Sequence, residues 1–288
     1  VTGAYAPSRG GYYFSSANVN KTDYKGFDIT LTHYNHINKF NYGAKLIWSY
    51  AYGRWLKYVG DSDNAPEYQR LTGKQIGSKY GFIANGLFQS EEEIANSATV
   101  KGYKALPGYI KYVDRNGDGI ITAAQDQGYV GKSATPKHTG SLNLFGNWKG
   151  FDFNVTMRGA FGFDILNMPR LQYGAPVMLA RGNVLTEAFD TKFGKVPLAV
   201  DQELQYVSYY IEKGNYWKID NVTLGYTFNF NTWIKRLRIY GQVSNLATIT
   251  GYSGIDPEVS ISGLAPGVDN KNRYPSTRTY TLGVSVKF

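Results

Sequence analysis

The segment that begins at Asp114 carries the sharpest chemical pattern in this chain of 288 residues. Asp114, Asn116 and Asp118 place side-chain oxygens at positions one, three and five of a loop, and Gly119 follows at position six. Hard oxygen ligands at this spacing suit Ca²⁺, and a glycine at position six allows the tight turn of a calcium loop. The segment therefore suggests a calcium site.

The end of the same loop departs from the calcium pattern. Gln125 stands where the usual acid at position twelve belongs, and Asp126 comes one residue later. Two interpretations stay open: a polar turn that holds no metal, or a distorted calcium site. For the second, the expected ligands are the side chains of Asp114, Asn116, Asp118 and Asp126 and the carbonyl of Ile120.

Other residues offer little material for catalysis. The chain has no cysteine and three histidines, which excludes a thiol nucleophile and a thiolate metal site. His33 and His36 fall at a strand end and its turn, where a spacing of three does not bring two rings together as it does on a helix. Asp256 and Glu258 flank Pro257. They offer a glycoside hydrolase its carboxylate pair, but turn formation is the better explanation. An enzyme is therefore not expected.

Composition favours strands and turns over helices. Aromatic residues make up 16% of the chain and glycine contributes 33 residues, a mixture typical of β-rich proteins. No stretch approaches the roughly 18 consecutive apolar residues of a membrane-spanning helix. The net charge of +9 comes from scattered lysines and arginines without a run of five, so no nucleic-acid partner is expected.

Seven segments alternate between apolar and polar residues: 27–32, 42–53, 141–148, 151–161, 222–228, 237–244 and 280–288. Alternation with period two places one set of side chains on each face of a strand. The set expected to face lipid is Phe27, Ile29, Leu31, Phe153, Val155, Leu224, Leu282 and Val284. The set expected to face a lumen is Asp28, Thr30, Asn154, Thr156, Thr223 and Thr281.

The connections between these segments alternate strictly between short and long. The short ones are 35–39, 149–150 and 229–235, and the long ones are 57–139, 164–215 and 247–277. Short periplasmic turns and long external loops are typical of an outer-membrane barrel. The sequence therefore predicts an all-β fold, an antiparallel transmembrane β-barrel segment with long extracellular loops. The segment supplies about seven or eight strands of a larger barrel, because an open sheet would leave unpaired backbone groups in lipid. The missing strands are expected before Val1.

A series of motifs carries a family resemblance from about Gly26 onward. In chain order the motifs are Tyr80-Gly81-Phe82, Gly86-Leu87-Phe88, Pro107-Gly108-Tyr109, Asn116-Gly117-Asp118-Gly119, Tyr216-Trp217-Lys218-Ile219-Asp220-Asn221, Asp256-Pro257-Glu258, Tyr274-Pro275 and the terminal Phe288. In this order they resemble the SusC/RagA-like family of TonB-dependent outer-membrane transporters. The extra residue before Asp126 is a departure from the family pattern.

The resemblance implies that residues 1–288 are the C-terminal part of a TonB-dependent receptor β-barrel, with the plug domain absent from this chain. It implies active import of oligosaccharides or peptides across the outer membrane of a Gram-negative, Bacteroidetes-like bacterium. The implied partners are the remaining N-terminal barrel and plug segment, a SusD-like surface lipoprotein, TonB through the plug segment, and the lipid bilayer.

A second hypothesis is a secreted, calcium-stabilised, β-rich protein that binds glycans through exposed aromatic residues. Detergent dependence separates the two hypotheses. A chain that stays soluble and monomeric without detergent would contradict the importer.

Overall fold

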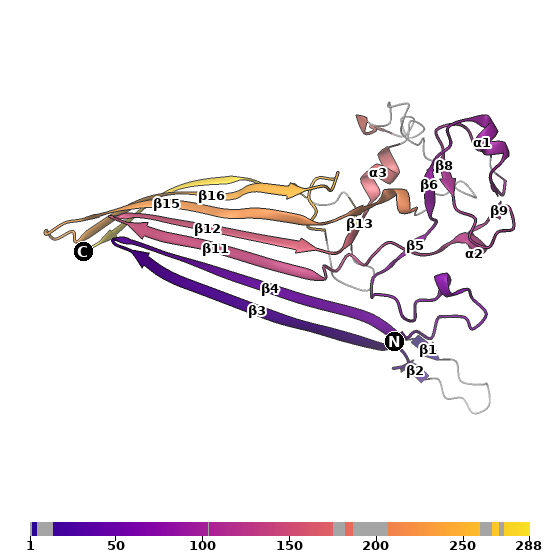
Figure 1. Ribbon diagram of the computed structural model, residues 1–288, viewed down its shortest axis with the longest axis horizontal. Coiled ribbons are helices and arrows are strands. Elements are labelled where there is room, and N and C mark those ends of the chain that lie inside the picture. The colour runs from indigo at the N-terminus through magenta and orange to yellow at the C-terminus, as the bar shows by residue number, and fades with distance from the viewer. Residues whose placement is uncertain are drawn as a thin grey trace.

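Seven long strands pair side by side into one antiparallel sheet in the computed structural model (Figure 1). The structure describes residues 2–4, 14–102, 104–174, 182–186, 207–259, 267–270 and 274–288. The strands of this sheet are β3 (Lys21–Ile37), β4 (Phe40–Lys57), β11 (His138–Trp148), β12 (Phe151–Phe161), β15 (Tyr216–Asn229), β16 (Arg236–Thr250) and β18 (Thr279–Lys287). Their order, β18-β16-β15-β12-β11-β4-β3, places each strand beside its predecessor in the sheet. The predicted all-β fold and its seven strands are confirmed.

The first two strands are longer than the alternation predicted. β3 begins at Lys21, where its pairing with β4 also begins, whereas apolar and polar residues alternate only from Phe27. The additional residues are mostly polar, so hydrophobic periodicity does not mark them, and backbone pairing with β4 makes them a strand. A strand needs about 9–11 residues to cross a bilayer. The 17 residues of β3 and the 18 of β4 therefore reach beyond that thickness.

Short turns lie at one end of the sheet and long connections at the other (Figure 1). The turn between β11 and β12 is the two-residue hairpin that was predicted, with Lys149 at φ 47° and Gly150 at φ 93°. Two consecutive residues with positive φ suit the tight hairpin turns whose twist matches that of paired strands. The C-terminus lies at the same end as the short turns (Figure 1). The alternation of short and long connections is therefore confirmed.

The long connections fold into a lobe beyond the sheet. The strands of the lobe are β5 (Lys79–Gly81), β6 (Ala84–Leu87), β7 (Thr99–Val100), β8 (Ile110–Tyr112), β9 (Ile120–Ile121), β10 (Gly128–Val130), β13 (Asp164–Asn167), β14 (Ile211–Lys213) and β17 (Val268–Asp269). Its helices are η1 (Glu67–Gln69), α1 (Glu91–Ala95), α2 (Ala123–Asp126), α3 (Met168–Tyr173) and η5 (Ser208–Tyr210). A further pair, β1 (Thr2–Ala4) and β2 (Phe14–Ala17), stands apart from the main sheet. Among the described residues, no helix is both long and apolar enough to span a membrane.

A hydrophobic core holds the lobe together across two long connections. Phe82, Ile110 and Ile121 come from the first connection, and Leu171 and Val207 from the second, and each is at most 2% exposed. Burying a large apolar side chain stabilises a fold by roughly 1.5–3 kcal/mol. The two connections therefore form one folded unit rather than separate loops.

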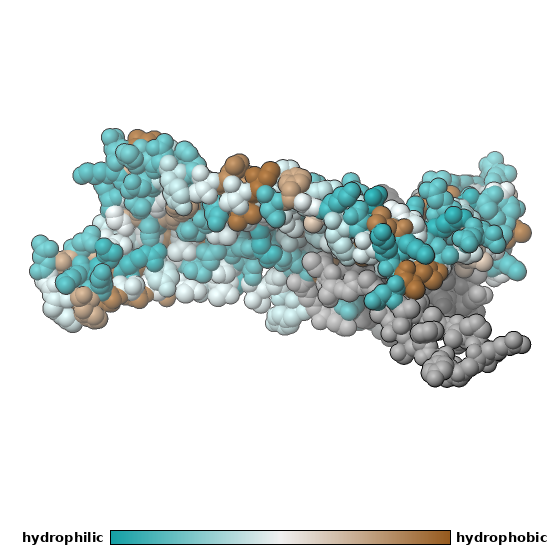
Figure 2. All heavy atoms as spheres, turned by 90° about the horizontal axis from the view of Figure 1, so that it is seen from below, coloured by the Kyte–Doolittle hydropathy of each residue, from teal (hydrophilic) through white to brown (hydrophobic). Residues whose placement is uncertain are grey.

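The register of the sheet separates its two faces. Val155 of β12 pairs with Leu144 and Val222, whereas the next residue, Thr156, pairs with Asn143 and Asn221. Large apolar side chains on the first face are exposed in the described chain, including Phe27 at 49%, Leu31 at 60%, Leu224 at 63%, Leu282 at 81% and Val284 at 62%. Exposed hydrophobic residues also gather in several places along the molecule in the view of Figure 2. A contiguous apolar face of this kind indicates a surface that is covered by a membrane or by another apolar surface.

Candidate functional site: the polar face and its ion-pair cluster

The polar face of the sheet carries a hydrogen-bonded set of short polar side chains. Asn143 of β11 donates to Asn154 and Thr156 of β12, each at 3.0 Å. On β15, the Thr223 hydroxyl donates to Asn221 at 2.9 Å. Because these side chains bond to one another along and between strands, the face presents a wettable surface rather than a packing surface.

Two cations lie side by side where this face meets the lobe. Arg158 of β12 and Lys218 of β15 are direct partners in the strand register. Like charges opposite each other on neighbouring strands repel. The pair is therefore stable only with carboxylates beside it.

Three carboxylates surround the two cations. Arg158 donates through Nε to Asp220 at 2.5 Å and through its two terminal nitrogens to both oxygens of Glu258. Lys218 Nζ lies 3.1 Å from Asp256 Oδ1 and 2.5 Å from Glu258 Oε2. The side chains of Lys218 and Asp256 are 3% and 5% exposed. We call these five residues the ion-pair cluster.

The cluster joins the third long connection to the sheet. Glu258 also accepts from the Tyr216 hydroxyl at 3.0 Å, and Asp256 accepts from the Ser276 hydroxyl. Burial by itself would raise the pKa of Glu258, but its hydrogen bonds to Arg158 and Lys218 outweigh burial and lower that pKa to about 2. Asp256 follows the same pattern: burial raises its pKa, while Ser276 and Lys218 lower it below the usual value. Both carboxylates are therefore charged at neutral pH.

This arrangement does not suit the carboxylate pair of a glycoside hydrolase. Such an enzyme needs one protonated acid at working pH, with a raised pKa, and both Asp256 and Glu258 have lowered pKa values. The expectation that these residues have a structural role in a turn agrees with the bond from the Glu258 backbone N–H to Asp256 at 2.9 Å.

A cavity of about 400 Å³ lies in the lobe near the end of β4. Its lining includes the aromatic side chains of Trp55, Tyr58, Tyr80 and Tyr129 beside aliphatic ones, and Lys79 contributes an ammonium group. Burial lowers the pKa of Lys79 to about 8 even though Asp164 acts in the opposite direction. Aromatic rings with one charged group make a site for a small ligand that has both an apolar and a polar part.

The predicted calcium loop forms a tight turn around Asp114. Asp114 accepts from the backbone N–H groups of Gly117 at 2.6 Å and Gly119 at 2.7 Å, and the bond from Gly119 holds the pKa of Asp114 below its usual value. Asp126 is fully buried, and its two oxygens accept from the backbone N–H groups of Arg115 and Thr122.

The geometry of this loop suits a metal ion only in part. The Asn116 amide donates to Asp118 at 2.7 Å, so the side chains of the turn bond to one another. Within the part of the chain that the structure describes, no three histidine, aspartate or glutamate side chains are grouped as they would be around a metal ion. The calcium site, with Ile120 as its carbonyl ligand, stays a prediction.

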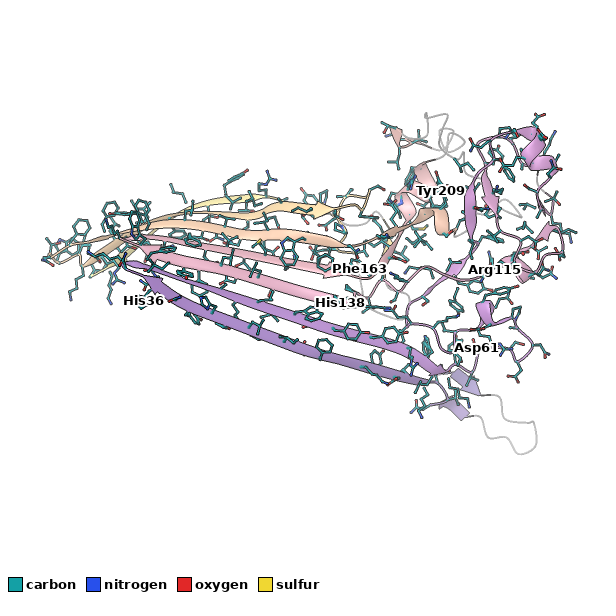
Figure 3. All side chains as sticks on the ribbon, viewed as in Figure 1. His36, Asp61, Arg115, His138, Phe163 and Tyr209 are labelled. Atoms are coloured by element: carbon teal, nitrogen blue, oxygen red, sulfur yellow. The ribbon has the colours of Figure 1, made fainter. Side chains whose placement is uncertain are left out.

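The three histidines do not come together. His36 lies at the turn end of the sheet and His138 at the lobe end (Figure 3). The His138 ring stacks on Trp48, with ring centres 5.8 Å apart, and accepts a hydrogen bond from that indole at 3.3 Å. Its role is therefore packing at the end of the sheet.

Sequence reasoning missed Arg158, Lys218, Tyr216 and Ser276 as members of a site. Arg158 stood on the predicted polar face of its strand, and a charged residue inside a barrel wall calls for a partner. That requirement was a usable signal, although the strand pattern does not say which distant residue meets it.

Comparison with known proteins relates the whole chain to part of larger receptors. At 28% identity, 98% of the chain aligns with 30% of the TonB-dependent receptor P3 of Formosa agariphila. At the same identity, 73% of the chain aligns with 20% of the TonB-dependent receptor SusC of Bacteroides thetaiotaomicron. No family model matches the chain. The chain spans about a third or less of the length of these curated relatives.

Solved structures show the same fold. The RagAB peptide importer in its open-open state matches 100% of this chain and 31% of the neighbour's chain, with a TM-score of 0.70 and 22% identity. The RagAB peptide transporter matches 98% of this chain with a TM-score of 0.67. The resemblance to SusC/RagA-like proteins is therefore confirmed over the barrel portion of these larger proteins, and these relatives are receptors and transporters rather than enzymes.

Proposed function

We propose that this chain forms the C-terminal barrel wall and external loops of an outer-membrane importer of the SusC/RagA-like kind, which takes up oligosaccharides or peptides with energy delivered through TonB. One observation carries the proposal. A sheet with one apolar and one polar face has its long connections gathered at one end, in a chain similar to TonB-dependent receptors.

The proposed orientation follows from the two faces. The apolar face contacts the hydrocarbon of the outer membrane and the polar face lines the lumen, because lipid offers no partner to polar side chains. The short turns and the C-terminus lie in the periplasm, and the lobe stands outside the cell. The organism is proposed to be a Gram-negative bacterium of the Bacteroidetes, as for the SusC relative.

The proposed partners begin with the rest of the barrel. In the described sheet, β3 and β18 are the two edge strands, and each has a single neighbour, β4 and β16 respectively. An edge inside hydrocarbon leaves N–H and C=O groups unpaired at several kcal/mol each. Strands outside residues 1–288 are therefore proposed to pair with both edges. A plug segment would couple the barrel to TonB, and a SusD-like lipoprotein would cover its mouth.

Within this importer, the structure supports separate roles for two sites. The ion-pair cluster fixes the third external connection to the wall at the mouth of the lumen. The cavity lined by Trp55, Tyr58, Tyr80 and Tyr129 is proposed to receive part of the substrate. Its aromatic rings suit a sugar ring or an apolar peptide side chain equally well, so the substrate stays open between these two classes.

Whole-cell uptake tests the proposal. The gene for the intact protein is deleted and restored in its own bacterium, and uptake of fluorescent oligosaccharide and peptide pools is compared with and without TonB. We expect uptake of one pool to require both this protein and TonB, and the protein to fractionate with outer membranes. A protein found soluble in the culture medium without detergent would instead support the secreted glycan-binding alternative.

A further inference from the structure

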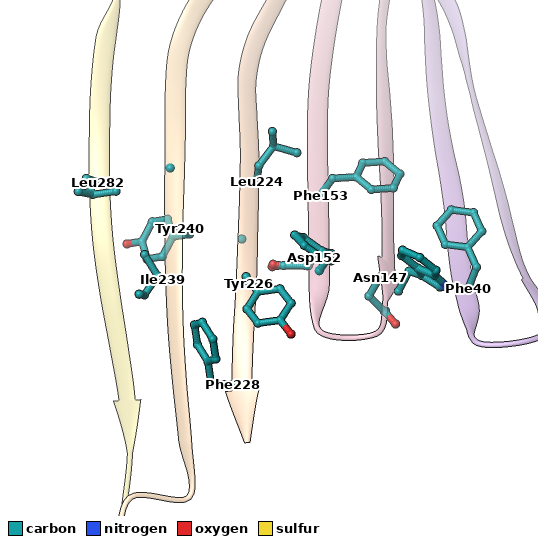
Figure 4. Close-up of a pocket in the computed structure, with 14 residues that line it drawn as sticks. Phe40, Asn147, Asp152, Phe153, Leu224, Tyr226, Phe228, Ile239, Tyr240 and Leu282 are labelled. Carbon is teal, nitrogen blue, oxygen red and sulfur yellow. The ribbon is translucent and has the colours of Figure 1, made fainter. Parts of the chain in front are cut away.

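A groove of about 680 Å³ runs along the apolar face near the turn end of the sheet (Figure 4). One row of the register explains it. Phe153, Leu224, Gly241 and Leu282 stand in line across β12, β15, β16 and β18. Three of these positions carry large apolar side chains, and Gly241 carries none. A Cβ added at Gly241 would meet no atom within 4 Å, so this glycine is the open floor of the groove.

Aromatic side chains form the end of the groove that points toward the turns. Phe151 and Tyr226 contact edge to face with ring centres 4.5 Å apart, and Phe228 packs on Tyr226 at 4.6 Å. Trp148 also lines the groove. Rings of this kind sit at the boundary between hydrocarbon and headgroups in membrane barrels. The groove therefore begins at that boundary and extends into the apolar band.

Basic residues are spread along the turn end of the sheet. Lys39, Lys149 and Lys235 lie in its three short turns, and Arg236 and Lys287 lie at the adjoining ends of β16 and β18. No acid lies in these turns, and Asp152, at the start of β12, is paired with Arg238 on the polar face at 2.8 Å. Lys149 Nζ lies 4.9 Å from the centre of the Trp148 ring, so an ammonium group stands beside a wall of the groove. An anionic headgroup would find a positive surface here.

We propose that this groove binds an anionic glycerophospholipid of the periplasmic leaflet, with an acyl chain along Gly241 and the phosphate beside Lys149. The inference rests on the proposed function, because it takes the turn end as periplasmic. That orientation selects a phospholipid over the lipopolysaccharide of the outer leaflet. Hydrocarbon alone gives no preference, since bulk lipid is equally apolar. Shape fit against Gly241 and charge at the turns therefore supply the selectivity.

Native mass spectrometry of the intact protein, purified in detergent with its own barrel and plug, tests the inference. The protein is mixed with phosphatidylglycerol or with phosphatidylcholine, and retained lipid is counted. We expect at least tenfold more retained phosphatidylglycerol than phosphatidylcholine. Gly241→Leu fills the floor of the groove and should remove most of this retention. Lys149→Asn suits the positive φ of that turn position and should weaken phosphatidylglycerol retention about fivefold while leaving phosphatidylcholine retention unchanged.

Leu46→Phe is the matched control, because Leu46 lies on the same apolar face, in the row of Leu31 and Leu142, outside the groove. Retention in this variant should equal that of the unchanged protein. Each variant is checked for a folded barrel by heat-dependent mobility in gels. Equal retention of the two lipids, or undiminished retention by Gly241→Leu, would overturn the inference. The inference would also be overturned if the species lost from the Gly241→Leu variant were lipopolysaccharide or a second copy of the protein. Absence of the protein from outer membranes would instead overturn the proposed function.

Discussion

Replacing Lys218 by methionine removes the most buried cation of the ion-pair cluster and tests whether the cluster holds the third external connection in place. Methionine keeps much of the length and apolar volume of the lysine stem, so the change mainly removes charge. Asp256, whose side chain is 5% exposed, then loses the cation that approaches it at 3.1 Å. Removing one partner of a buried ion pair costs about 3–5 kcal/mol, because the other charge is left uncompensated. If that cost falls on local opening of the connection, the open population rises by a factor of roughly 150 to 5,000, since each 1.4 kcal/mol is about tenfold.

Hydrogen exchange on the intact protein in detergent measures this opening. The amides of residues 252–259 should lose protection in Lys218→Met, while those in β12 keep theirs. Arg238→Ala is the control, since it also breaks an ion pair on the polar face, with Asp152, but both partners are about 30% exposed and belong to strands. A pair that is this accessible to solvent contributes about 1 kcal/mol or less. Equal loss of protection at residues 252–259 in the two variants would refute the anchoring role.

The remaining predictions concern the wall, the loop near Asp114 and acid. Val155→Arg on the apolar face should reduce barrel stability by roughly 2–4 kcal/mol if it lies near the membrane midplane, and Thr156→Arg on the polar face should reduce it much less. Urea unfolding in lipid vesicles measures both changes. Equal effects of the two variants would contradict the assignment of faces. Isothermal titration calorimetry should detect calcium binding by the unchanged protein and none by the Asp114→Asn variant. If the unchanged protein gives no heat of binding, the loop is a polar turn that holds no metal. Because the folded-state pKa of Glu258 is lowered to about 2, its stabilisation is present above its unfolded pKa near 4.5 and is lost as pH falls toward 2. Hydrogen-exchange protection at residues 252–259, corrected for intrinsic rates, should therefore be constant from pH 7 to 5 and should decrease once the pH is below about 4.5. A decrease between pH 7 and 5 would show that a titratable group other than Glu258 controls the opening.

The strands and their faces were open to prediction because alternation is a local property. Each strand residue turns its side chain to the face opposite that of its neighbour, so Phe153 and Asn154 reveal their faces without knowledge of any partner strand. Likewise, Lys149-Gly150 between two apolar runs allows few structures other than a tight hairpin. The strand order followed, because short connections join antiparallel neighbours.

The ion-pair cluster and the lobe were not open to prediction in the same way. Arg158 and Glu258 lie 100 residues apart, and the connection that carries Glu258 has no periodicity from which its course could be read. The core of the lobe raises the same difficulty, because Phe82 and Val207 form an isolated bridge between two long connections. Only the three-dimensional fold brings such pairs together. Asp220 adds a local irregularity, since the register shifts between Ile219 and Asn221, and a bulge of this kind redirects a side chain toward the cluster.

The cations on the sheet and the carboxylates on the third connection are each stabilised by the other. Without the connection, Arg158 and Lys218 would face each other across β12 and β15, and among the cluster residues only Asp220 would remain as a carboxylate. Without the two cations, Asp256 and Glu258 would be a buried and a partly buried acid that have lost the charged partners they contact. Either half alone carries uncompensated charge, and burial makes that charge costly. An exchange of the third connection between relatives should therefore succeed only when the residues at 158 and 218 are exchanged with it, because the two strands and the connection are stable as one electrostatic unit.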